Sequence, residues 1–202
     1  MALTFWYEFS STYSYLSALR IEDAAKAAHV PVVWQPFLLG PIFKASGYGG
    51  SPNLMSKEKA SYMWTDAARR ADQRGHPFQR PLPFPQNSVL AARAAIALPP
   101  AKRPRFSKAI FAEVFANQRD IADPAVIVQA AATADLDAEA VLANGRSSEA
   151  RAALFAAVEK AQELAIFGAP TFITSDHALF WGDDRLEDAL AWEASGSQPD
   201  AR

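Results

Sequence analysis

The chain has 202 residues, of which 50% are apolar and 21% charged, a composition typical of a folded globular domain. Its formal net charge is −2, so it has no basic excess with which to bind nucleic acid or an anionic membrane surface. It contains no cysteine, which excludes disulfides, cysteine-ligated metals and a Cys-X-X-Cys redox centre. Any thiol chemistry must therefore use a sulfur atom supplied by a ligand.

The N-terminal segment MALTFWYEF has neither the basic residues nor the long apolar run of a secretion signal. No apolar run along the chain reaches the roughly 20 residues that a membrane-spanning helix needs. His29, His76 and His177 lie far apart in the sequence and do not have the spacing of metal ligands. We therefore expect a cytoplasmic protein with no membrane partner and no metal site.

The first part of the chain predicts a β-α-β unit. Leu3 to Phe9 is short and rich in aromatic residues, as expected of a buried strand. Ser14 to Ala28 has apolar residues at helical spacing, and Pro31 ends that helix. Val32 to Gln35 predicts a second strand, which Pro36 closes. A helical crossover of this kind joins parallel strands.

The middle of the chain is predicted to be mainly helical. Phe37 to Ser56 contains four glycines and little periodicity of apolar residues, which predicts a long loop. Loops of this length inside a compact domain usually have a functional role. Lys57 to Arg74 carries one apolar stripe and predicts an amphipathic helix. The proline-rich segment from His76 to Asn87 holds several large apolar residues, so we expect an ordered wall of a site rather than a linker. Further helices are predicted at Ser88–Leu98, Phe106–Phe115, Asp123–Ala134 and Ser147–Ala165.

The C-terminal part predicts two strands and a helix. Thr171 to Thr174 and Ala178 to Trp181 are short apolar runs on either side of a turn. Arg185 to Trp192 predicts a closing helix, and Ala194 to Arg202 is a polar tail that we expect to be mobile. The order β-α-β, helical block, β-β-α predicts one mixed sheet in a single α/β domain over residues 1–202. The helical insertion is expected at about residues 37–165.

Ser11 is the strongest candidate for chemistry. It lies where the first predicted strand gives way to a helix, in the run FSSTYSY that begins at Phe9. The unpaired N–H groups and positive dipole of a helix N-terminus favour an anion such as a thiolate. A hydroxyl there can donate a hydrogen bond to a bound sulfur atom and lower its pKa. Serine is also a common helix N-cap, so a purely structural role is the alternative.

Three further segments carry candidate residues, each with an ordinary alternative. Pro170 directly precedes a strand, a place where trans-proline is the usual form. Asp183 and Asp184 lie between a strand and a helix, where they can hold a ligand's ammonium group or simply cap the helix. Lys44 follows an apolar run and is either a partner for a substrate carboxylate or a solvated surface residue.

Taken in order, five motifs resemble those of the 2-hydroxychromene-2-carboxylate isomerase family. They are the run FSSTYSYL that begins at Phe9, Pro36–Lys44, Phe84–Ser88, Phe167–Phe172 and Trp181–Arg185. The resemblance extends over nearly the whole chain, and the family is related to kappa-class glutathione transferases and to DsbA-type disulfide oxidoreductases. It implies a thioredoxin-like α/β fold with a large helical insertion, a homodimer, and reduced glutathione as cofactor.

The resemblance also implies roles for individual residues. Ser11 matches the serine that activates the thiol. The cofactor-binding positions match Ser11, Ala169, the cis-proline Pro170, Trp181, Asp183 and Asp184. The substrate-binding positions match Lys44, Asn53 and Phe84. One departure is Thr12, which stands where the family usually has proline and which predicts a softer first turn in the first helix.

The activity that the resemblance implies is glutathione-dependent cis-trans isomerisation of an aromatic unsaturated keto acid. The model reaction converts 2-hydroxychromene-2-carboxylate into trans-o-hydroxybenzylidenepyruvate, in naphthalene-type degradation. A free thiol has a pKa near 8.5 and is mostly protonated at pH 7, so a hydrogen bond from Ser11 would raise the reactive fraction. A kappa-like glutathione transferase and a non-catalytic thioredoxin-fold binding protein are the alternatives. A disulfide oxidoreductase is the least expected, because the chain has no redox cysteines.

Overall fold

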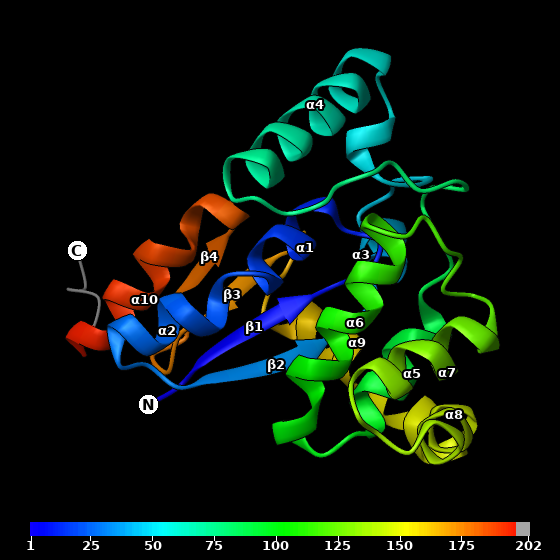
Figure 1. Cartoon of the computed structure of the whole chain (residues 1–202). Coiled ribbons are helices and arrows are strands. Elements are labelled where there is room, and N and C mark those ends of the chain that lie inside the picture. The colour runs from blue at the N-terminus through cyan, green and yellow to red at the C-terminus, as the bar shows by residue number, and fades with distance from the viewer. Residues whose placement is uncertain (197–202) are drawn as a thin grey trace.

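The computed structural model describes residues 1–196 and contains, within them, a four-stranded sheet in the order β2-β1-β3-β4 (Figure 1). β1 (Leu3–Tyr7) runs parallel to β2 (Val32–Pro36) and antiparallel to β3 (Thr171–Ile173). β4 (Leu179–Trp181) pairs antiparallel with β3. The mixed sheet predicted from the sequence is therefore confirmed, and the two ends of the chain meet in it because β3 lies directly beside β1.

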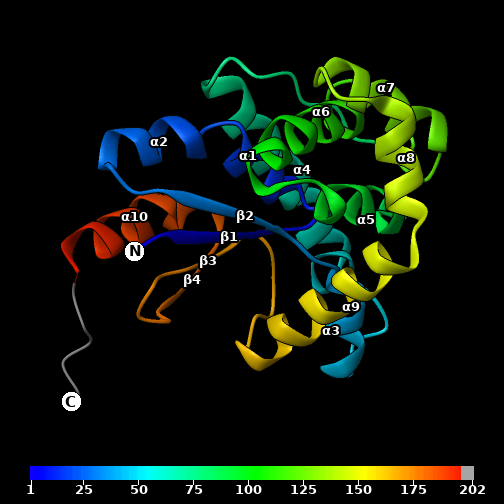
Figure 2. The same ribbon diagram turned by 90° about the horizontal axis from the view of Figure 1, so that it is seen from below.

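Alternation along β1 divides the core between the two faces of the sheet. Leu3, Phe5 and Tyr7 are fully buried in a large apolar cluster on one face, whereas Trp6 belongs to a smaller cluster on the other. Helices cover both faces (Figure 2). The first face is covered by α1 (Thr12–Ala18), α2 (Ile21–Ala28), α6 (Arg103–Phe115) and α10 (Leu186–Ser195), and the second by α3 (Leu39–Ala45) and α9 (Ser148–Glu163).

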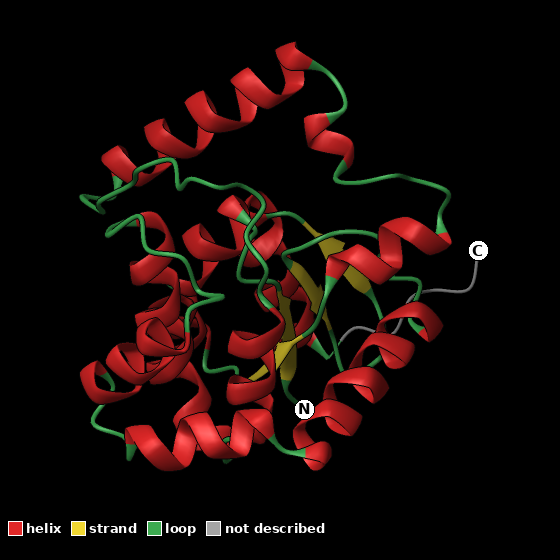
Figure 3. Ribbon diagram, turned by 90° about the vertical axis from the view of Figure 1, so that its right-hand side faces the viewer, coloured by secondary structure: helices red, strands yellow, loops and turns green. Residues whose placement is uncertain are grey.

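The chain between β2 and β3 is mainly helical, as predicted. Its other helices are α4 (Lys57–Gln73), α5 (Val89–Ala97), α7 (Pro124–Thr133) and α8 (Ala138–Arg146). α4 stands apart from the group formed by α5 to α8 (Figures 1 and 3). Ser56 and Ser147 begin α4 and α9, because their hydroxyls accept hydrogen bonds from backbone N–H groups at 3.1 and 3.0 Å.

The helix predicted from Ser14 to Ala28 is wrong as a single element, since α1 ends at Ala18 and α2 begins at Ile21. Arg20, between them, leaves the helical conformation, with φ −127° and ψ −13°. Its Nε donates a 3.0 Å hydrogen bond to the carboxylate of Asp183. The break in the helix therefore turns an arginine toward the other end of the chain.

The long loop predicted from Phe37 to Ser56 is also wrong in part, because it contains α3 and a short 3₁₀ helix at Pro52–Leu54. Gly40 and Pro41 favour a loop when read from sequence alone. Both fall in the first turn of α3, however, where a proline loses no intrahelical hydrogen bond. This segment is nevertheless one wall of the cavity described below.

The sequence pattern predicts no element where α8 lies. Gly145 of α8 packs against Ala94 of α5, and an added Cβ there would come within 3.1 Å of Ala94. At the C-terminus α10 continues to Ser195, beyond the predicted end at Trp192, and the rest of the predicted mobile tail, residues 197–202, lies outside the described residues. Among the helices of residues 1–196, none is both long enough and apolar enough to cross a membrane.

Candidate active site

A cavity of about 1400 Å³ opens where the ends of β1, β3 and β4 meet the helical insertion. Its walls come from segments that are far apart in the sequence: residues 8–13, 38–52, 84–89, 167–170 and 181–184, together with α4. Of the proline-rich segment predicted to form a wall, Phe84 to Asn87 line this cavity and residues 76–83 do not. Eight residues that the sequence singles out line this cavity, namely Ser11, Lys44, Phe84, Ala169, Pro170, Trp181, Asp183 and Asp184.

Ser11 caps the first helix and also lies on the wall of the cavity. Its backbone is extended, with φ −94° and ψ 117°, and its Oγ accepts a 3.1 Å hydrogen bond from the N–H of Ser14, so it is the N-cap of α1. The same hydroxyl donates a 2.9 Å hydrogen bond to the carbonyl oxygen of Ala169. Ser11 therefore combines a capping role with a place on the cavity wall.

The segment that carries Ala169 is shaped by its neighbours. The Ala169–Pro170 peptide bond is cis, and Pro170 accepts a 3.0 Å hydrogen bond from the N–H of Gly182. Gly168 lies under the indole of Trp181, and an added Cβ would come within 2.3 Å of the indole nitrogen. Only glycine leaves room for this contact, so the sequence Gly-Ala-Pro places Trp181 against the backbone next to Ser11.

Asp183 and Asp184 differ sharply in environment. The Asp183 side chain is 1% exposed, and Ser17 and Arg20 each donate a 3.0 Å hydrogen bond to its Oδ1. Its Oδ2 faces Arg74 at 3.4 Å and Arg70 at 3.6 Å. Both carboxylate oxygens are therefore already neutralised by the protein. The Asp184 side chain is 53% exposed on the cavity wall, where its nearest described cation is Arg185.

The three predicted substrate-binding residues come from the part of the chain between β2 and α5. Lys44 is exposed in the last turn of α3 and lines the cavity. Phe84 is half-buried, with its ring 4.6 Å from that of Trp64. Asn53 lies in the short 3₁₀ helix at Pro52–Leu54, next to cavity-lining Pro52.

Several residues that line the cavity were not predicted as site residues from the sequence. Tyr13 donates a 2.9 Å hydrogen bond to Asp66 of α4, and Arg70 donates another of 2.9 Å to the same oxygen. Burial, followed by the bond to Asp66, raises the pKa of Tyr13, so its hydroxyl stays protonated. The helical spacing of Asp66 and Arg70 is visible in the sequence, but nothing there links them to Tyr13.

Glu8 is the second such residue. It is 6% exposed, and its Oε2 accepts a 2.9 Å hydrogen bond from the N–H of Ser10 while its Oε1 accepts one from the hydroxyl of Ser88. Burial raises the pKa of Glu8 to about 7, against the lowering effect of hydrogen bonds from Ser88, Ser10 and Phe9. The cavity therefore contains a buried carboxyl group that titrates near neutrality.

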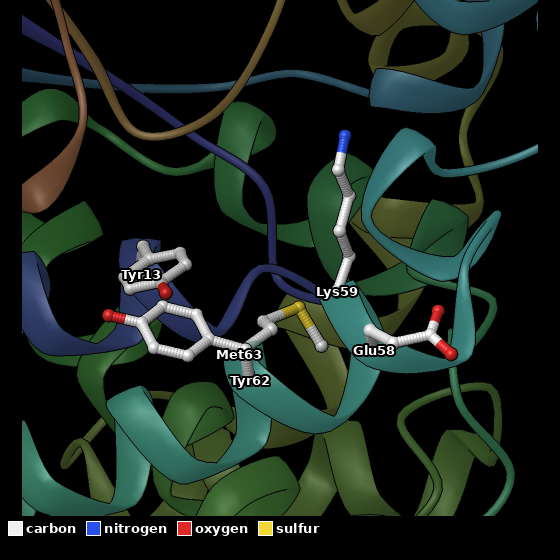
Figure 4. Close-up of a pocket in the computed structure, with 5 residues that line it drawn as sticks. All are labelled: Tyr13, Glu58, Lys59, Tyr62 and Met63. Carbon is white, nitrogen blue, oxygen red and sulfur yellow. The ribbon is translucent and has the colours of Figure 1, made fainter.

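A smaller hollow of about 340 Å³ adjoins the main cavity, sharing Tyr13, Tyr62 and Met63 with it. Figure 4 shows the rings of Tyr13 and Tyr62 close together at one side, with Met63 beside them. Lys59 extends its ammonium group away from α4 at the other side, and Glu58 points away from it. The two hollows together offer an elongated surface with aromatic and charged groups.

The strand order, the helical insertion and the cis-proline that follows the Ala169 carbonyl bonded to Ser11 define a thioredoxin-like α/β protein. The model of the DSBA-like thioredoxin domain matches residues 2–191. The chain belongs to this family.

Individual relatives agree with this assignment. The chain is 26% identical over 188 residues to a 2-hydroxychromene-2-carboxylate isomerase of Sphingobium xenophagum, covering 92% of this chain and 94% of that protein. A solved 2-hydroxychromene-2-carboxylate isomerase superposes with a TM-score of 0.85 at 23% identity, covering 98% of this chain and 100% of the other. The cytosolic disulfide reductase DsbM from Pseudomonas aeruginosa, solved with GSH, superposes with a TM-score of 0.66 at 18% identity, covering 96% of each chain.

Proposed function

We propose that this protein is a glutathione-dependent cis-trans isomerase of an aromatic unsaturated keto acid, of the 2-hydroxychromene-2-carboxylate type. The observation that carries the proposal is the position of the Ser11 hydroxyl on the cavity wall, 2.9 Å from the Ala169 carbonyl oxygen. Because the chain has no cysteine, the thiol in this reaction would have to come from a ligand. The 26% identical isomerase supports the reaction class.

The donor set of the cavity fits glutathione, which carries two carboxylates, one ammonium group and one thiol. Ser11 offers a hydroxyl donor for sulfur, and Asp184 offers an exposed carboxylate for the ammonium group. Lys44 and Arg70 are cations on the cavity wall. A volume of about 1400 Å³ leaves room for an aromatic substrate beside the tripeptide.

Bound glutathione would supply a thiolate that adds reversibly to a conjugated carbon of the substrate, permits rotation about the former double bond and then leaves. Ser11 would stabilise the anionic sulfur by donating the hydrogen bond that Ala169 accepts in its absence. Lys44 would hold the substrate carboxylate or balance charge that develops on the carbonyl side. Tyr13, Trp181 and Phe84 provide aromatic walls around this position.

The experiment that tests the proposal is calorimetric titration of the protein with reduced glutathione, combined with ultraviolet absorbance of the thiolate. We expect binding, with the thiol pKa lowered from its free value, and regeneration of glutathione during turnover of the keto acid. A release of glutathione conjugate, detected by mass spectrometry, would instead favour the kappa-like transferase. No binding at millimolar glutathione would contradict the proposal and favour a non-catalytic binding protein. The homodimer and the cytoplasmic location stay predictions.

A further inference from the structure

Glu8 is a buried acid that the proposed chemistry does not yet use. It stands at the end of β1, three positions before Ser11, and it lines the same cavity. Its backbone oxygen accepts a 3.0 Å hydrogen bond from the N–H of Ser11, so the turn that presents Ser11 begins at Glu8. The residue that carries this carboxyl group therefore lies in the same turn as Ser11, which would bind the thiol.

The immediate partners of the Glu8 carboxyl group are neutral. Ser88 at the start of α5 and the N–H groups of Ser10 and Phe9 donate to it. No cation is paired with it among residues 1–196, which is why burial dominates its titration and brings the pKa to about 7. The group is accordingly able to hold or release a proton at neutral pH.

The charged and titratable groups on the surrounding elements either bind partners other than Glu8 or are exposed. On α1 and α4, Tyr13 and Arg70 both bond to Asp66. The carboxylate of Asp183 faces its arginines, and the exposed Asp184 lies near Arg185. Lys44 and Tyr48, after the end of β2, are exposed. Neither histidine nor cysteine lines the cavity in the described part of the chain.

A thiol that ionises in this cavity has to transfer its proton elsewhere. Two anions close together in a poorly solvated place repel one another, so a thiolate and an ionised Glu8 disfavour each other. Groups coupled in this way titrate as a pair and share protons between them. Bulk water accepts the proton of a free thiol, whereas here a carboxylate with suitable affinity lies on the same wall.

We propose that Glu8 and the thiol of the bound cofactor share a single proton, so that the thiol ionises by passing its proton to Glu8. The S–H bond breaks, its electron pair stays on sulfur, and the proton ends on a carboxylate oxygen of Glu8. Nothing is oxidised or reduced, and the net charge of the cavity is unchanged. The inference rests on the proposed function, and Glu8 acts in it as the proton acceptor for the thiol and not as a contact to the substrate.

The test is to count the protons released when glutathione binds, by calorimetry near pH 7.5 in buffers of different ionisation enthalpy. In the wild type, Glu8 retains most of the proton, so we expect release of well under half a proton per site. In Glu8→Gln that acceptor is gone, and release should rise to roughly one proton per site. Thiolate absorbance should show a lower thiol pKa in Glu8→Gln, because a repelling negative charge is removed.

Two further variants separate this effect from simple loss of structure. Glu193 is 5% exposed on α10 and accepts a hydrogen bond from the N–H of Ser175, outside the cavity lining. Glu193→Gln removes a comparable buried carboxylate and should leave the proton count as in the wild type. Ser88→Ala keeps Glu8 but removes a donor that lowers its pKa, so proton release should lie between the wild type and Glu8→Gln.

The possible failures are distinguishable. If Glu8→Gln binds glutathione and releases the same number of protons as Glu193→Gln, the proton-sharing inference is overturned while the proposed function stands. If the thiol pKa rises in Glu8→Gln, Glu8 merely supports the Ser11 turn, and the inference is again overturned. If Glu8→Gln does not fold, Ser88→Ala decides, and an unchanged proton count overturns the inference. Failure of the wild type to bind glutathione overturns the proposed function, and the inference with it.

Discussion

The hydroxyl of Ser11 donates to the carbonyl oxygen of Ala169 at 2.9 Å, across a sequence separation of 158 residues. This hydrogen bond joins the start of the first helix to the backbone that leads into β3. A thiolate that enters the cavity would compete with that carbonyl for the same hydrogen atom. The carbonyl oxygen of Ala169 therefore fixes the direction in which the Ser11 hydroxyl hydrogen points.

Replacement of Ser11 by alanine should act on both stability and chemistry. Loss of the N-cap should cost about 1 kcal/mol of unfolding free energy. Loss of the donor should raise the pKa of the bound thiol and reduce turnover by roughly 100-fold, as for other preorganised donors to an anion. Thermal unfolding, thiolate absorbance and steady-state kinetics would measure the three effects.

Ser147 provides a matched control for that variant. It caps α9 in the same way, with its Oγ accepting from the N–H of Ala150 at 3.0 Å and donating to the carbonyl oxygen of Asn144 at 2.7 Å. It does not line the cavity. Ser147→Ala should lose a similar amount of stability but keep the thiol pKa and the activity. Equal kinetic losses in both variants would show that Ser11 matters only as a cap.

Substitution of Asp183 should mainly lower the free energy of unfolding, whereas substitution of Asp184 should mainly weaken glutathione binding. Asp183→Asn leaves three arginines facing a neutral group in a buried place, which we expect to destabilise the protein by roughly 3 kcal/mol or more. Asp184→Asn should leave the unfolding free energy within about 0.5 kcal/mol but weaken glutathione binding about five-fold, as for an exposed ion pair. Chemical denaturation and calorimetry would measure the two quantities. The reverse pattern would place the ligand's ammonium group at Asp183.

Thr12→Pro should stabilise the protein. Thr12 is the first residue of α1, where a proline loses no intrahelical hydrogen bond. Ser11 before it already has the extended backbone that precedes proline, with ψ 117°. We expect a gain of about 0.4–1 kcal/mol from the reduced freedom of the unfolded chain, read as a higher Tm. A lower Tm would show that the buried Thr12 side chain makes contacts a proline ring cannot replace.

The titration of Glu8 predicts how stability depends on pH. Its pKa is raised from 4.5 to about 7 in the folded state, so the folded protein binds this proton more tightly than the unfolded chain. The stabilising contribution is full below pH 4.5 and is lost as pH rises through 7, amounting to roughly 3 kcal/mol. Denaturation of the wild type and Glu8→Gln across this range should give a difference that falls with pH. A constant difference would contradict the raised pKa.

A substitution at Lys44 tests the proposal that this residue binds the substrate carboxylate. Lys44→Gln should raise KM for a keto acid about five-fold, the effect expected of an exposed ion pair. Any additional fall in kcat would report charge stabilisation in the transition state. Lys26 is a matched control, because it is an exposed lysine in the last turn of α2, outside the cavity lining. Indistinguishable kinetics of the two variants would remove Lys44 from the site.

The sheet was accessible to sequence reasoning because each strand has a local signature. The short, aromatic-rich run that begins at Leu3 and the short segments at Thr171 and Leu179 on either side of a turn predict strands without knowledge of their partners. The division of the first helix at Arg20 was not accessible, because the partner that Arg20 meets there, Asp183, comes from the other end of the chain. Local patterns carry no information about such a partner.

The same distinction applies to the candidate site. Ser11 and Asp184 follow strands, and residues at strand ends meet at one edge of a sheet, so their common cavity could be anticipated. Glu8 reads as an ordinary acid in the sequence. Its raised pKa comes from burial, against the lowering effect of the hydrogen bond from Ser88, and burial is a property of the assembled structure.

Because β3 lies beside β1, the sheet can be completed only after the C-terminal part of the chain has been synthesised. β1 leaves the ribosome first, but the strand that covers one of its edges begins only at Thr171. At about 5–20 residues per second, that edge waits on the order of ten seconds for its partner. The carbonyl of Ala169 arrives equally late. An unfinished chain therefore lacks the hydrogen bond between Ser11 and Ala169, and its β1 edge is open to pairing with another chain during this interval.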